Sequence, residues 1–275
     1  MDIMEILKVV LFGLVEGITE WLPISSTGHM ILLDEFVKLN VSAEFLSMFL
    51  VVIQLGAILA VVVLYFGQLW PFSLKEKFFI KKDTFSMWFK IVVACIPAAI
   101  VGILFEDMLD ELFYNYQTVA MALIVFGILF ILIEWQNRGM RSRINSISEI
   151  TYPIAIWIGV FQLIAAVFPG TSRSGATILG AIMVGVSRTV AAEFTFFLAV
   201  PVMLGASLLK IVKFGFDFTT MELVLLFTGM AVAFVVSILV IKLLLGYIRK
   251  HTFTVFGWYR IILGVAVLAY FWMAG

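Results

Sequence analysis

Two short polar stretches interrupt this otherwise apolar chain, WLPISSTGHM at residues 21–30 and VFPGTSRSGAT at residues 167–177. Both are dense in Pro, Gly, Ser and Thr, and each lies in the middle of a longer apolar segment, 5–38 or 150–188. The pieces on either side are too short to cross a bilayer alone, because a spanning helix needs about 20 residues. Each segment is therefore predicted to enter the membrane, break and return as a re-entrant helical hairpin.

The composition makes lipid the expected solvent of the chain. Hydrophobic residues make up 63% of it and charged residues 13%, with a mean hydropathy of +1.15, whereas soluble domains are about 45–50% apolar and about 25% charged. Stretches long enough to span a bilayer as helices fall at 45–66, 87–105, 116–135, 190–211, 221–245 and 255–274. The expected fold class is an all-α polytopic membrane protein.

Charge and cysteine content exclude other classes of protein. The formal net charge is zero, so no nucleic-acid partner is predicted. The single cysteine, Cys95, excludes an internal disulfide and is interpreted as a small buried hydrophobic residue. The N-terminal apolar run is interrupted by Glu16 and Glu20 and lacks a small-residue cleavage site, so it is not predicted to be a cleavable signal peptide.

The two polar breaks resemble each other, which indicates an internal repeat. At one constant offset, five residues of the first segment match five of the second: Gly13, Pro23, Ser25, Ser26 and Thr27 match Gly159, Pro169, Thr171, Ser172 and Arg173. Further along, AEFLSMFL (43–50) matches AEFTFFLA (192–199). Residues 1–145 and 146–275 are therefore expected to form two repeats, each a hairpin followed by three spans. Because three is odd, the second repeat is expected to be inverted.

Charge placement predicts the orientation. Basic residues gather in the loops at 67–86 and 137–149, and acidic residues gather in 107–115. Basic loops of membrane proteins face the cytoplasm. The first two loops are therefore expected inside, and 107–115 and both termini outside.

Ionisable residues inside membrane segments are costly and usually functional. Glu16 and Glu20 are four residues apart and share one helix face, His29 follows the first break, and Arg173 lies in the second. The alternative is that these residues lie near helix ends and are wetted by headgroup water. Their occurrence on both matching breaks favours a functional site.

Hydroxyl residues accompany the start of each returning helix and suggest an anion site. Such residues cap free backbone N–H groups, and the helix dipole adds partial positive charge. An ordinary N-cap explains either run alone, but together with the planar fork of Arg173 they predict a phosphate or diphosphate cradle. A cation or protons must then separate the two glutamates from the phosphates. A serine activated by a base could attack phosphorus. The hydroxyl residues are Ser25, Ser26, Thr27, Thr171, Ser172 and Ser174.

Two long motifs, GLVEGITEWLPISSTGHMIL (13–32) and PGTSRSGATILG (169–180), resemble the signature segments of the undecaprenyl-diphosphatase, or bacitracin-resistance, family. The resemblance extends to VIQLGAILAVV (52–62) and AAEFTFFLAVP (191–201). It implies a multi-pass enzyme of the bacterial plasma membrane that hydrolyses undecaprenyl diphosphate to undecaprenyl phosphate and inorganic phosphate. It also implies recycling of the lipid carrier for peptidoglycan synthesis, bacitracin resistance, and a site open to the extracytoplasmic side.

The resemblance also implies roles for particular residues. The catalytic set is Glu16, Glu20, Ser26, His29 and Arg173; the substrate-binding residues are Ser25, Thr27, Ser172 and Ser174, to which we add Thr171. A divalent cation, Mg²⁺ or Ca²⁺, is implied, with Glu16 and Glu20 as its ligands. Our mechanistic hypothesis makes Ser26 the nucleophile and Glu20 its base, with His29 assisting proton transfer. Direct attack by water remains open.

Two other classes of function compete with hydrolysis. Broken helices and inverted repeats are also a transport architecture, so a transporter or flippase of a polyprenyl phosphate is the main alternative. A purely structural membrane protein leaves the charged residues of the breaks unexplained. The combination of Glu16, Glu20, Ser26 and His29 favours the enzyme, since moving an anion needs neither a base nor a nucleophile. The sequence leaves the oligomeric state open, with a homodimer as one alternative.

Overall fold

The computed structural model describes residues 3–74 and 79–274, with the backbone alone at residues 106, 107, 110 and 274. Two helix pairs form the hairpins, α1 (Ile3–Thr19) with α2 (Ser26–Phe36), and α8 (Tyr152–Val167) with α9 (Arg173–Met183). The remaining helices are α3 (Ala43–Val52), α4 (Gln54–Leu64), α5 (Phe66–Leu69), α6 (Lys82–Phe113), α7 (Tyr116–Gln136), the 3₁₀ turn η1 (Ile147–Glu149), α10 (Arg188–Phe214), α11 (Thr220–Ile248) and α12 (Thr254–Ala274).

The all-α polytopic class is confirmed. Within the described residues, six helical segments are long and apolar enough to cross a membrane, and they coincide with the six predicted stretches: Ala43–Leu64, Lys82–Phe105, Tyr116–Gln136, Arg188–Phe214, Thr220–Ile248 and Thr254–Met273. Each predicted break contains a non-helical stretch, 21–25 in the first and 168–172 in the second, so 5–38 and 150–188 each contain two helices.

One predicted loop is wrong. Helix α6 continues to Phe113 and leaves only Tyr114 and Asn115 before α7, so residues 107–115 are mostly helical. The reason lies in FEDMLDELF (105–113), where the apolar residues recur at helical spacing between the acidic ones. The acidic residues interrupt the apolar run without interrupting the helix. In the predicted cytoplasmic loop at 67–86, residues 75–78 lie outside the described part of the chain.

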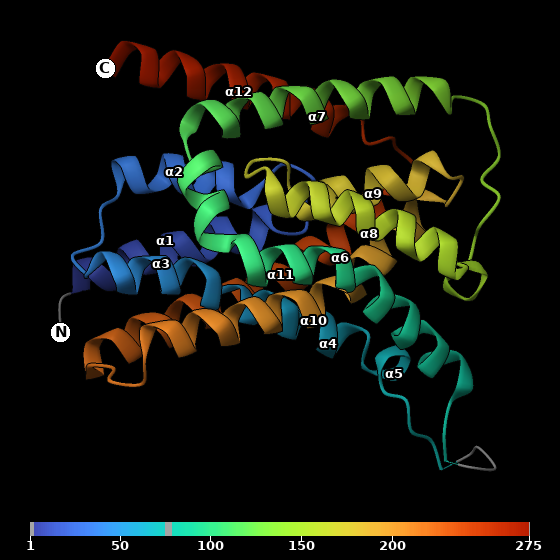
Figure 1. The fold of residues 1–275 in the computed structure, drawn as a ribbon, viewed down its shortest axis with the longest axis horizontal. Coiled ribbons are helices and arrows are strands. Elements are labelled where there is room, and N and C mark those ends of the chain that lie inside the picture. The colour runs from blue at the N-terminus through green and yellow to red at the C-terminus, as the bar shows by residue number, and fades with distance from the viewer. Residues whose placement is uncertain (1–2, 75–78, 275) are drawn as a thin grey trace.

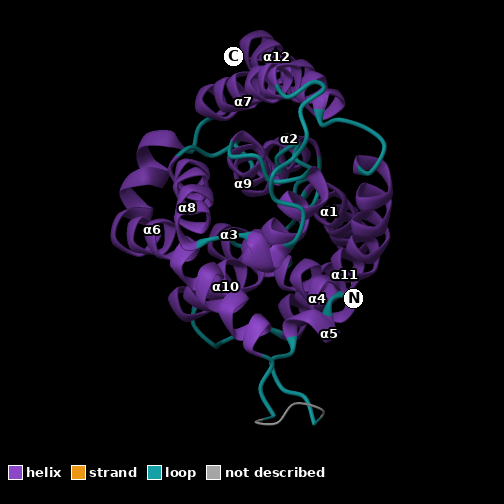
Figure 2. Cartoon of the chain, turned by 90° about the vertical axis from the view of Figure 1, so that its right-hand side faces the viewer, coloured by secondary structure: helices purple, strands orange, loops and turns teal. Residues whose placement is uncertain are grey.

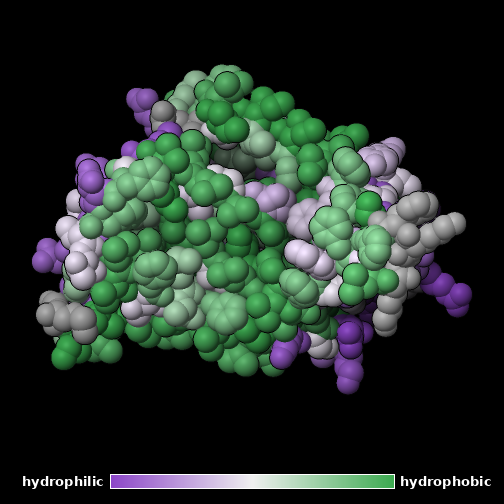
Figure 3. All heavy atoms as spheres, turned by 90° about the horizontal axis from the view of Figure 1, so that it is seen from below, coloured by the Kyte–Doolittle hydropathy of each residue, from purple (hydrophilic) through white to green (hydrophobic). Residues whose placement is uncertain are grey.

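The two hairpins approach the middle of the molecule from opposite ends (Figure 1). Helix α1 starts at the end that carries both termini, and α8 starts at the end that carries the α7–α8 connection. Seen along the long axis, α2 and α9 lie inside a surround of longer helices (Figure 2). Figure 3 shows a largely hydrophobic face whose hydrophilic residues gather toward its two ends, as expected of a protein whose sides contact lipid.

Glycine contacts fix the orientation of α1. Gly13 and Gly17 share one face of this helix, and a Cβ added to Gly13 would lie 2.8 Å from the carbonyl oxygen of Gly229 in α11. Small residues allow helices in a membrane to approach this closely. Because this face meets α11, the C-terminal end of α1 is turned into the protein, where Glu16 and Glu20, the residue that follows the helix, are both buried.

A second pair of glycines joins α7 to α12. A Cβ at Gly127 would lie 2.7 Å from the carbonyl oxygen of Gly257, and a Cβ at Gly257 would lie 2.8 Å from that of Gly127. The two helices run side by side along one edge of the molecule (Figure 1). This close contact brings the next turn of α12, with Tyr259 and Arg260, against the hairpins.

Candidate active site between the two hairpin tips

The first tip (residues 20–25) and the second tip (residues 168–172) end in the same way. Ser25 caps α2 with φ 75° and accepts a hydrogen bond from the backbone N–H of Gly28 at 3.2 Å. Ser172 caps α9 with φ 68° and accepts from the N–H of Gly175 at 3.1 Å. A positive φ is uncommon for a residue with a side chain. Its occurrence at both caps shows that the two tips share one backbone geometry.

The caps also correct the predicted match between the two breaks. Pro23 precedes its cap by two residues, whereas Pro169 precedes its cap by three. The single constant offset is therefore wrong beyond the prolines, because the second tip has one more residue between its proline and its capping serine. In three dimensions Ser25 corresponds to Ser172.

It follows that Ser26 corresponds to Arg173 and Thr27 to Ser174.

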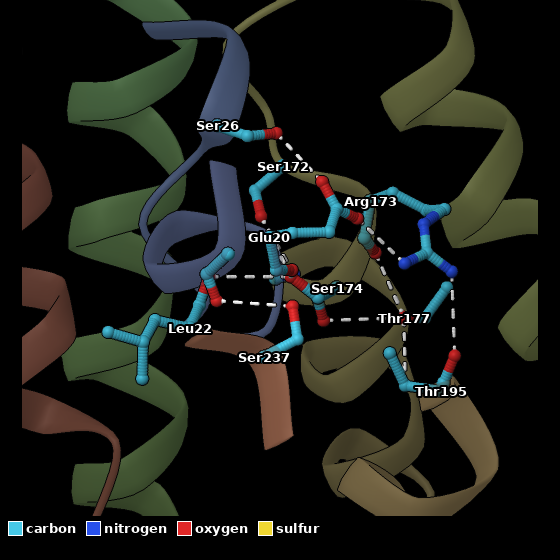
Figure 4. Close-up of polar contacts among 11 residues, drawn as sticks. Glu20, Leu22, Ser26, Ser172, Arg173, Ser174, Thr177, Thr195 and Ser237 are labelled. Atoms are coloured by element: carbon cyan, nitrogen blue, oxygen red, sulfur yellow. Dashed lines mark hydrogen bonds and ion pairs between the residues drawn. The ribbon is translucent and has the colours of Figure 1, made fainter. Parts of the chain in front are cut away.

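Glu20 is the centre of a hydrogen-bonded network between the tips (Figure 4). The hydroxyl of Ser26 donates to its Oε2 at 2.8 Å, and Nη2 of Arg173 donates to its Oε1 at 2.8 Å. The side chain of Glu20 is 6% exposed and that of Arg173 is 14% exposed, so this ion pair is largely shielded from solvent. A hydroxyl, a carboxylate and a guanidinium are thus joined by hydrogen bonds.

Hydroxyl groups of the second hairpin brace this network. Ser174 donates its hydroxyl hydrogen to the main-chain oxygen of Glu20 at 3.0 Å, which ties α9 to the first tip. Thr177 Oγ1 donates to the main-chain oxygen of Arg173 at 2.9 Å and lies 2.9 Å from Thr195 Oγ1. Nη1 of Arg173 also lies 3.5 Å from the main-chain oxygen of Thr195. Arg173 is therefore held both at its main-chain oxygen and at its guanidinium group.

Glu16 is buried beside Glu20, and its carboxylate has no hydrogen-bond donor. It is 1% exposed, no N–H or O–H group of the described residues donates to either carboxylate oxygen, and its neighbour is the carboxylate of Glu20. Two carboxylates this close require a proton or a cation between them. Mg²⁺ commonly uses one or two protein carboxylates and completes its shell with phosphate oxygens and water. Glu16 and Glu20 fit that pattern, although the described residues contain no group of three or more potential ligands among His, Cys, Asp and Glu.

His29, another predicted catalytic residue, also lies outside this network. Its Nδ1 donates to the main-chain oxygen of Ser25 at 2.7 Å, because a carbonyl oxygen can only accept. Its Nε2 lies 2.7 Å from the hydroxyl of Tyr259, and the two rings stack at 5.6 Å between centroids. Both ring nitrogens are therefore occupied, and His29 serves here to connect the first tip to α12.

A cavity of about 160 Å³ opens beside the Glu20–Arg173 pair. The predicted residues on its wall are Glu20, Ser26, Thr27, Ser172 and Arg173. The others are Gln54, Ala165, Pro169, Gly170, Val202, Met203 and Ala206. The predicted substrate-binding residues Ser25, Thr171 and Ser174 are not on the wall; they are buried behind it, where two of them cap and brace the tips.

A larger cavity, of about 460 Å³, lies elsewhere, along the segments 137–143 and 182–189. Its wall includes several arginines but none of the predicted site residues. Volume alone favours this larger cavity, whereas chemistry favours the smaller one. Only the smaller cavity combines a buried ion pair with a hydroxyl in hydrogen-bond contact, and we therefore assign the candidate site there.

Three residues near the tips were missed by the sequence analysis. Arg260 is fully buried and donates to main-chain oxygens of both tips, Tyr259 holds His29, and Gln54 lines the cavity. A signal existed for two of them, because Arg260 and Gln54 are polar residues inside the predicted spans 255–274 and 45–66. Tyr259 had none, since tyrosines are common in membrane helices near interfaces.

Comparisons with known proteins agree with this picture. The family model described as "Bacitracin resistance protein BacA" matches residues 9–266. The chain is 68% identical to Undecaprenyl-diphosphatase 1 of Clostridium acetobutylicum, over 98% of this chain and 99% of that protein. It is 65% identical to the undecaprenyl-diphosphatase of Desulfitobacterium hafniense, over 98% of both chains. It is 64% identical to that of Lachnoclostridium phytofermentans, over 100% of both.

Proposed function

The chain belongs to the bacitracin resistance protein BacA family, and on this premise we propose that it hydrolyses undecaprenyl diphosphate to undecaprenyl phosphate and inorganic phosphate. The three relatives named above are undecaprenyl-diphosphatases with 64–68% identity. The observation that carries the proposal is the hydrogen bond from Ser26 to Glu20 beside Arg173. This activity regenerates the lipid carrier of cell-wall synthesis and accounts for bacitracin resistance.

The cavity suits such a substrate chemically. Its wall combines the polar side chains of Ser26, Ser172 and Arg173 with the apolar side chains of Val202 and Met203 from α10. A lipid diphosphate has the same division, because its phosphates are strongly hydrated and its isoprenoid chain is apolar. The polar groups would bind the diphosphate, with the N-termini of α2 and α9 adding partial positive charge.

In the proposed reaction, Ser26 Oγ forms a bond to the terminal phosphorus while the bridging P–O bond breaks. The hydroxyl proton passes to Glu20, undecaprenyl phosphate leaves, and water then hydrolyses the phosphoserine to release inorganic phosphate. Arg173 stabilises the charge on the transferring phosphoryl group. Direct attack by a water molecule bound to Glu20 is the remaining alternative.

The Glu20–Arg173 ion pair suggests how substrate binding prepares the base. In the substrate-free protein the guanidinium of Arg173 is paired with the carboxylate of Glu20. A diphosphate competes for the guanidinium, since bidentate contacts to phosphate oxygens are strong. As Arg173 turns to the substrate, the carboxylate of Glu20 is released from Arg173 and stays in contact with the hydroxyl of Ser26.

A divalent cation is part of the proposal. Glu16 and Glu20 would hold it, because Glu16 has two buried oxygens without hydrogen-bond partners. When bound, the cation neutralises phosphate oxygens and lowers their repulsion of the attacking oxygen. The protein residues would supply binding, positioning and proton transfer around it.

The experiment that tests the function is phosphate release from a long-chain prenyl diphosphate by the purified protein in detergent. We expect turnover by the parent protein, loss of turnover in Ser26→Ala, and an unchanged rate in Ser47→Ala, an exposed serine of α3. Substantial residual turnover in Ser26→Ala would favour direct attack by water. A parent protein that releases no phosphate would refute the function itself.

We also propose that the halves 1–145 and 146–275 are inverted repeats in the plasma membrane, with the site open to the extracytoplasmic side. The opposite approach of the two hairpins supports this arrangement (Figure 1). Single cysteines at Arg141 and Glu111, both exposed, can be introduced on a Cys95→Ser background. An impermeant thiol reagent should label them from opposite sides of the membrane, and labelling from one side would exclude this topology.

A polyprenyl phosphate transporter remains the second candidate function, because the hairpins meet from opposite ends. It does not account for the hydrogen bond between Ser26 and Glu20. Reconstituted vesicles separate the two functions. Movement of a labelled lipid phosphate that persists in Ser26→Ala, without phosphate release by the parent, would favour transport.

A further inference from the structure

Arg260 is a charged residue without a counter-charge. It lies in the apolar helix α12, is 0% exposed, and forms no ion pair with any described side chain. Its guanidinium carbon lies 5.8 Å from the ring centre of Phe126. A buried, unpaired arginine is costly, so its hydrogen bonds must compensate for the loss of water.

Those hydrogen bonds converge on the two hairpin tips. Nη2 donates to the main-chain oxygens of Thr171 at 2.7 Å and Gly170 at 3.1 Å, both in the second tip. Nη1 donates to the main-chain oxygen of Pro23 in the first tip at 3.3 Å. Longer contacts reach Leu123 and Ala122 of α7, at 3.5 and 3.4 Å. One side chain therefore connects both tips to each other and to α7.

The choice of arginine follows from the backbone of the tips. Non-helical segments at membrane depth leave carbonyl oxygens without helical partners, and an unpaired carbonyl in an apolar setting is costly. Arginine has five N–H donors in one plane, more than any other side chain. The capping serines follow these carbonyl groups closely, Ser25 two residues after Pro23 and Ser172 one residue after Thr171. Arg260 therefore binds the chain next to the starts of both α2 and α9.

We propose that Arg260 is a positioning residue that holds the two tips together, so that the starts of α2 and α9 act on the same diphosphate. The proposal deepens the proposed function and rests on it. Arg260 is not on the cavity wall, so it acts through Ser26, Ser172 and Arg173. A diphosphate that engages both helix starts needs them at a fixed separation. A single phosphate that engages only one helix start does not.

The ratio of diphosphate affinity to phosphate affinity therefore tests the proposal, because a merely structural role for Arg260 would not change this ratio. Arg260→Lys keeps the charge and loses the planar fork, and Arg260→Met loses both. Calorimetric binding of inorganic diphosphate and inorganic phosphate, at fixed Mg²⁺ and in the detergent-purified full chain, measures the two affinities without turnover. Arg138→Lys and Arg138→Met, at an exposed arginine that follows α7, are the matched controls.

We expect Arg260→Lys to weaken diphosphate binding about tenfold, the loss that accompanies one or two charge-assisted hydrogen bonds. Phosphate affinity should stay close to that of the parent, and kcat for the lipid substrate should fall with the diphosphate affinity. Arg260→Met should show a larger loss in the same direction. Equal changes in both affinities, or none, would overturn the proposal.

A second variant covers the case in which neither Arg260 variant folds. A Cβ added to Gly175 in α9 would lie 2.9 Å from Nη1 of Arg260, so the Gly175→Ala substitution should displace the guanidinium of Arg260. Gly246→Ala, where a Cβ meets nothing within 4 Å, is its control. We expect Gly175→Ala to lower the ratio of diphosphate to phosphate affinity, and a ratio equal to that of the parent would overturn the proposal. Absence of lipid hydrolysis by the parent would refute the proposed function instead, because these affinities can still be compared.

Discussion

The first and second tips both end on a capping serine with a positive φ, yet the residue after the serine is Ser26 in one tip and Arg173 in the other. The same contrast recurs three positions further on, where the first hairpin has His29 and the second has Ala176. The carboxylates lie on the first hairpin alone, at Glu16 and Glu20. Matching backbones thus carry complementary chemistry.

This contrast separates what the fold needs from what the reaction needs. The features common to both tips are the capping serine and the glycine whose N–H group donates to it, and they satisfy backbone groups at the starts of α2 and α9. In the proposed reaction, the features that differ supply the nucleophile and the base from the first tip and a phosphate-binding guanidinium from the second. Damage to a shared feature should therefore affect stability, and damage to an unshared one should affect turnover.

The largest expected effect comes from Glu20→Gln in the first tip. This change keeps the shape, breaks the ion pair with Arg173 and removes the base beside Ser26, so kcat should fall by about 10²–10⁴-fold. Steady-state kinetics of the purified variant in detergent is the measurement. Glu44→Gln, at an exposed glutamate of α3, is the control. A near-normal rate would remove Glu20 from the mechanism.

The counterpart in the second tip is Arg173→Lys. Lysine keeps the charge but lacks the planar fork, so activity should fall by about 10²–10³-fold, the effect of losing a transition-state donor. Membrane insertion and yield should remain normal, since the tip backbone is unchanged. Steady-state kinetics of the variant beside Arg138→Lys is the measurement. If the lysine variant turns over at the parent rate, the two tips do not divide the chemistry as described.

A smaller, recoverable effect is expected for Glu16→Gln. If Glu16 serves mainly as a cation ligand, the variant should need more divalent metal, and added Mg²⁺ or Ca²⁺ should restore part of the rate. The same titration should not rescue Glu20→Gln. Full activity of the parent in excess chelator would contradict the metal role and leave both glutamates with acid–base work alone.

The smallest effects are expected at the shared caps. Ser25→Ala and Ser172→Ala each remove one cap and should lower the free energy of unfolding by about 1 kcal/mol. Ser25→Gly and Ser172→Gly should cost less, because glycine tolerates a positive φ. Thermal melting of the four purified variants is the measurement. Unequal losses at the two positions would show that the tips are less alike in energy than in backbone.

Sequence reasoning predicted the parts of this fold that depend on long apolar runs and on their interruption. The six spans and the two breaks were visible because a bilayer demands length and forbids unpaired backbone. It missed the extension of α6 to Phe113. The end of this helix was placed where the apolar run ends, although the helical spacing of apolar residues continues among the acidic residues that follow. It also missed the extra residue before Ser172, since only the cap geometry reveals that insertion.

The candidate site was only partly predictable, for a related reason. Residue type and spacing placed Glu20, Ser26 and Arg173 in the tips, and the structure brings these three into direct contact. Spacing could not separate the hydroxyls that line the cavity from those that brace it, such as Ser174. It also could not show that His29 is engaged by Tyr259, because that contact joins segments far apart in the chain.

Because the carboxylate of Glu16 is buried, the protons and cations in the surrounding solution affect the folding equilibrium. Any proton or cation that satisfies its two unpartnered oxygens binds the folded chain and has no comparable site in the unfolded one. Mass action then adds about 2.7 kcal/mol to the unfolding free energy when the ligand stands at about one hundred times its dissociation constant. If the proposed divalent cation is that ligand, chelation during purification would withdraw this contribution, and the stability of the protein outside the membrane would depend on the ions supplied with the detergent.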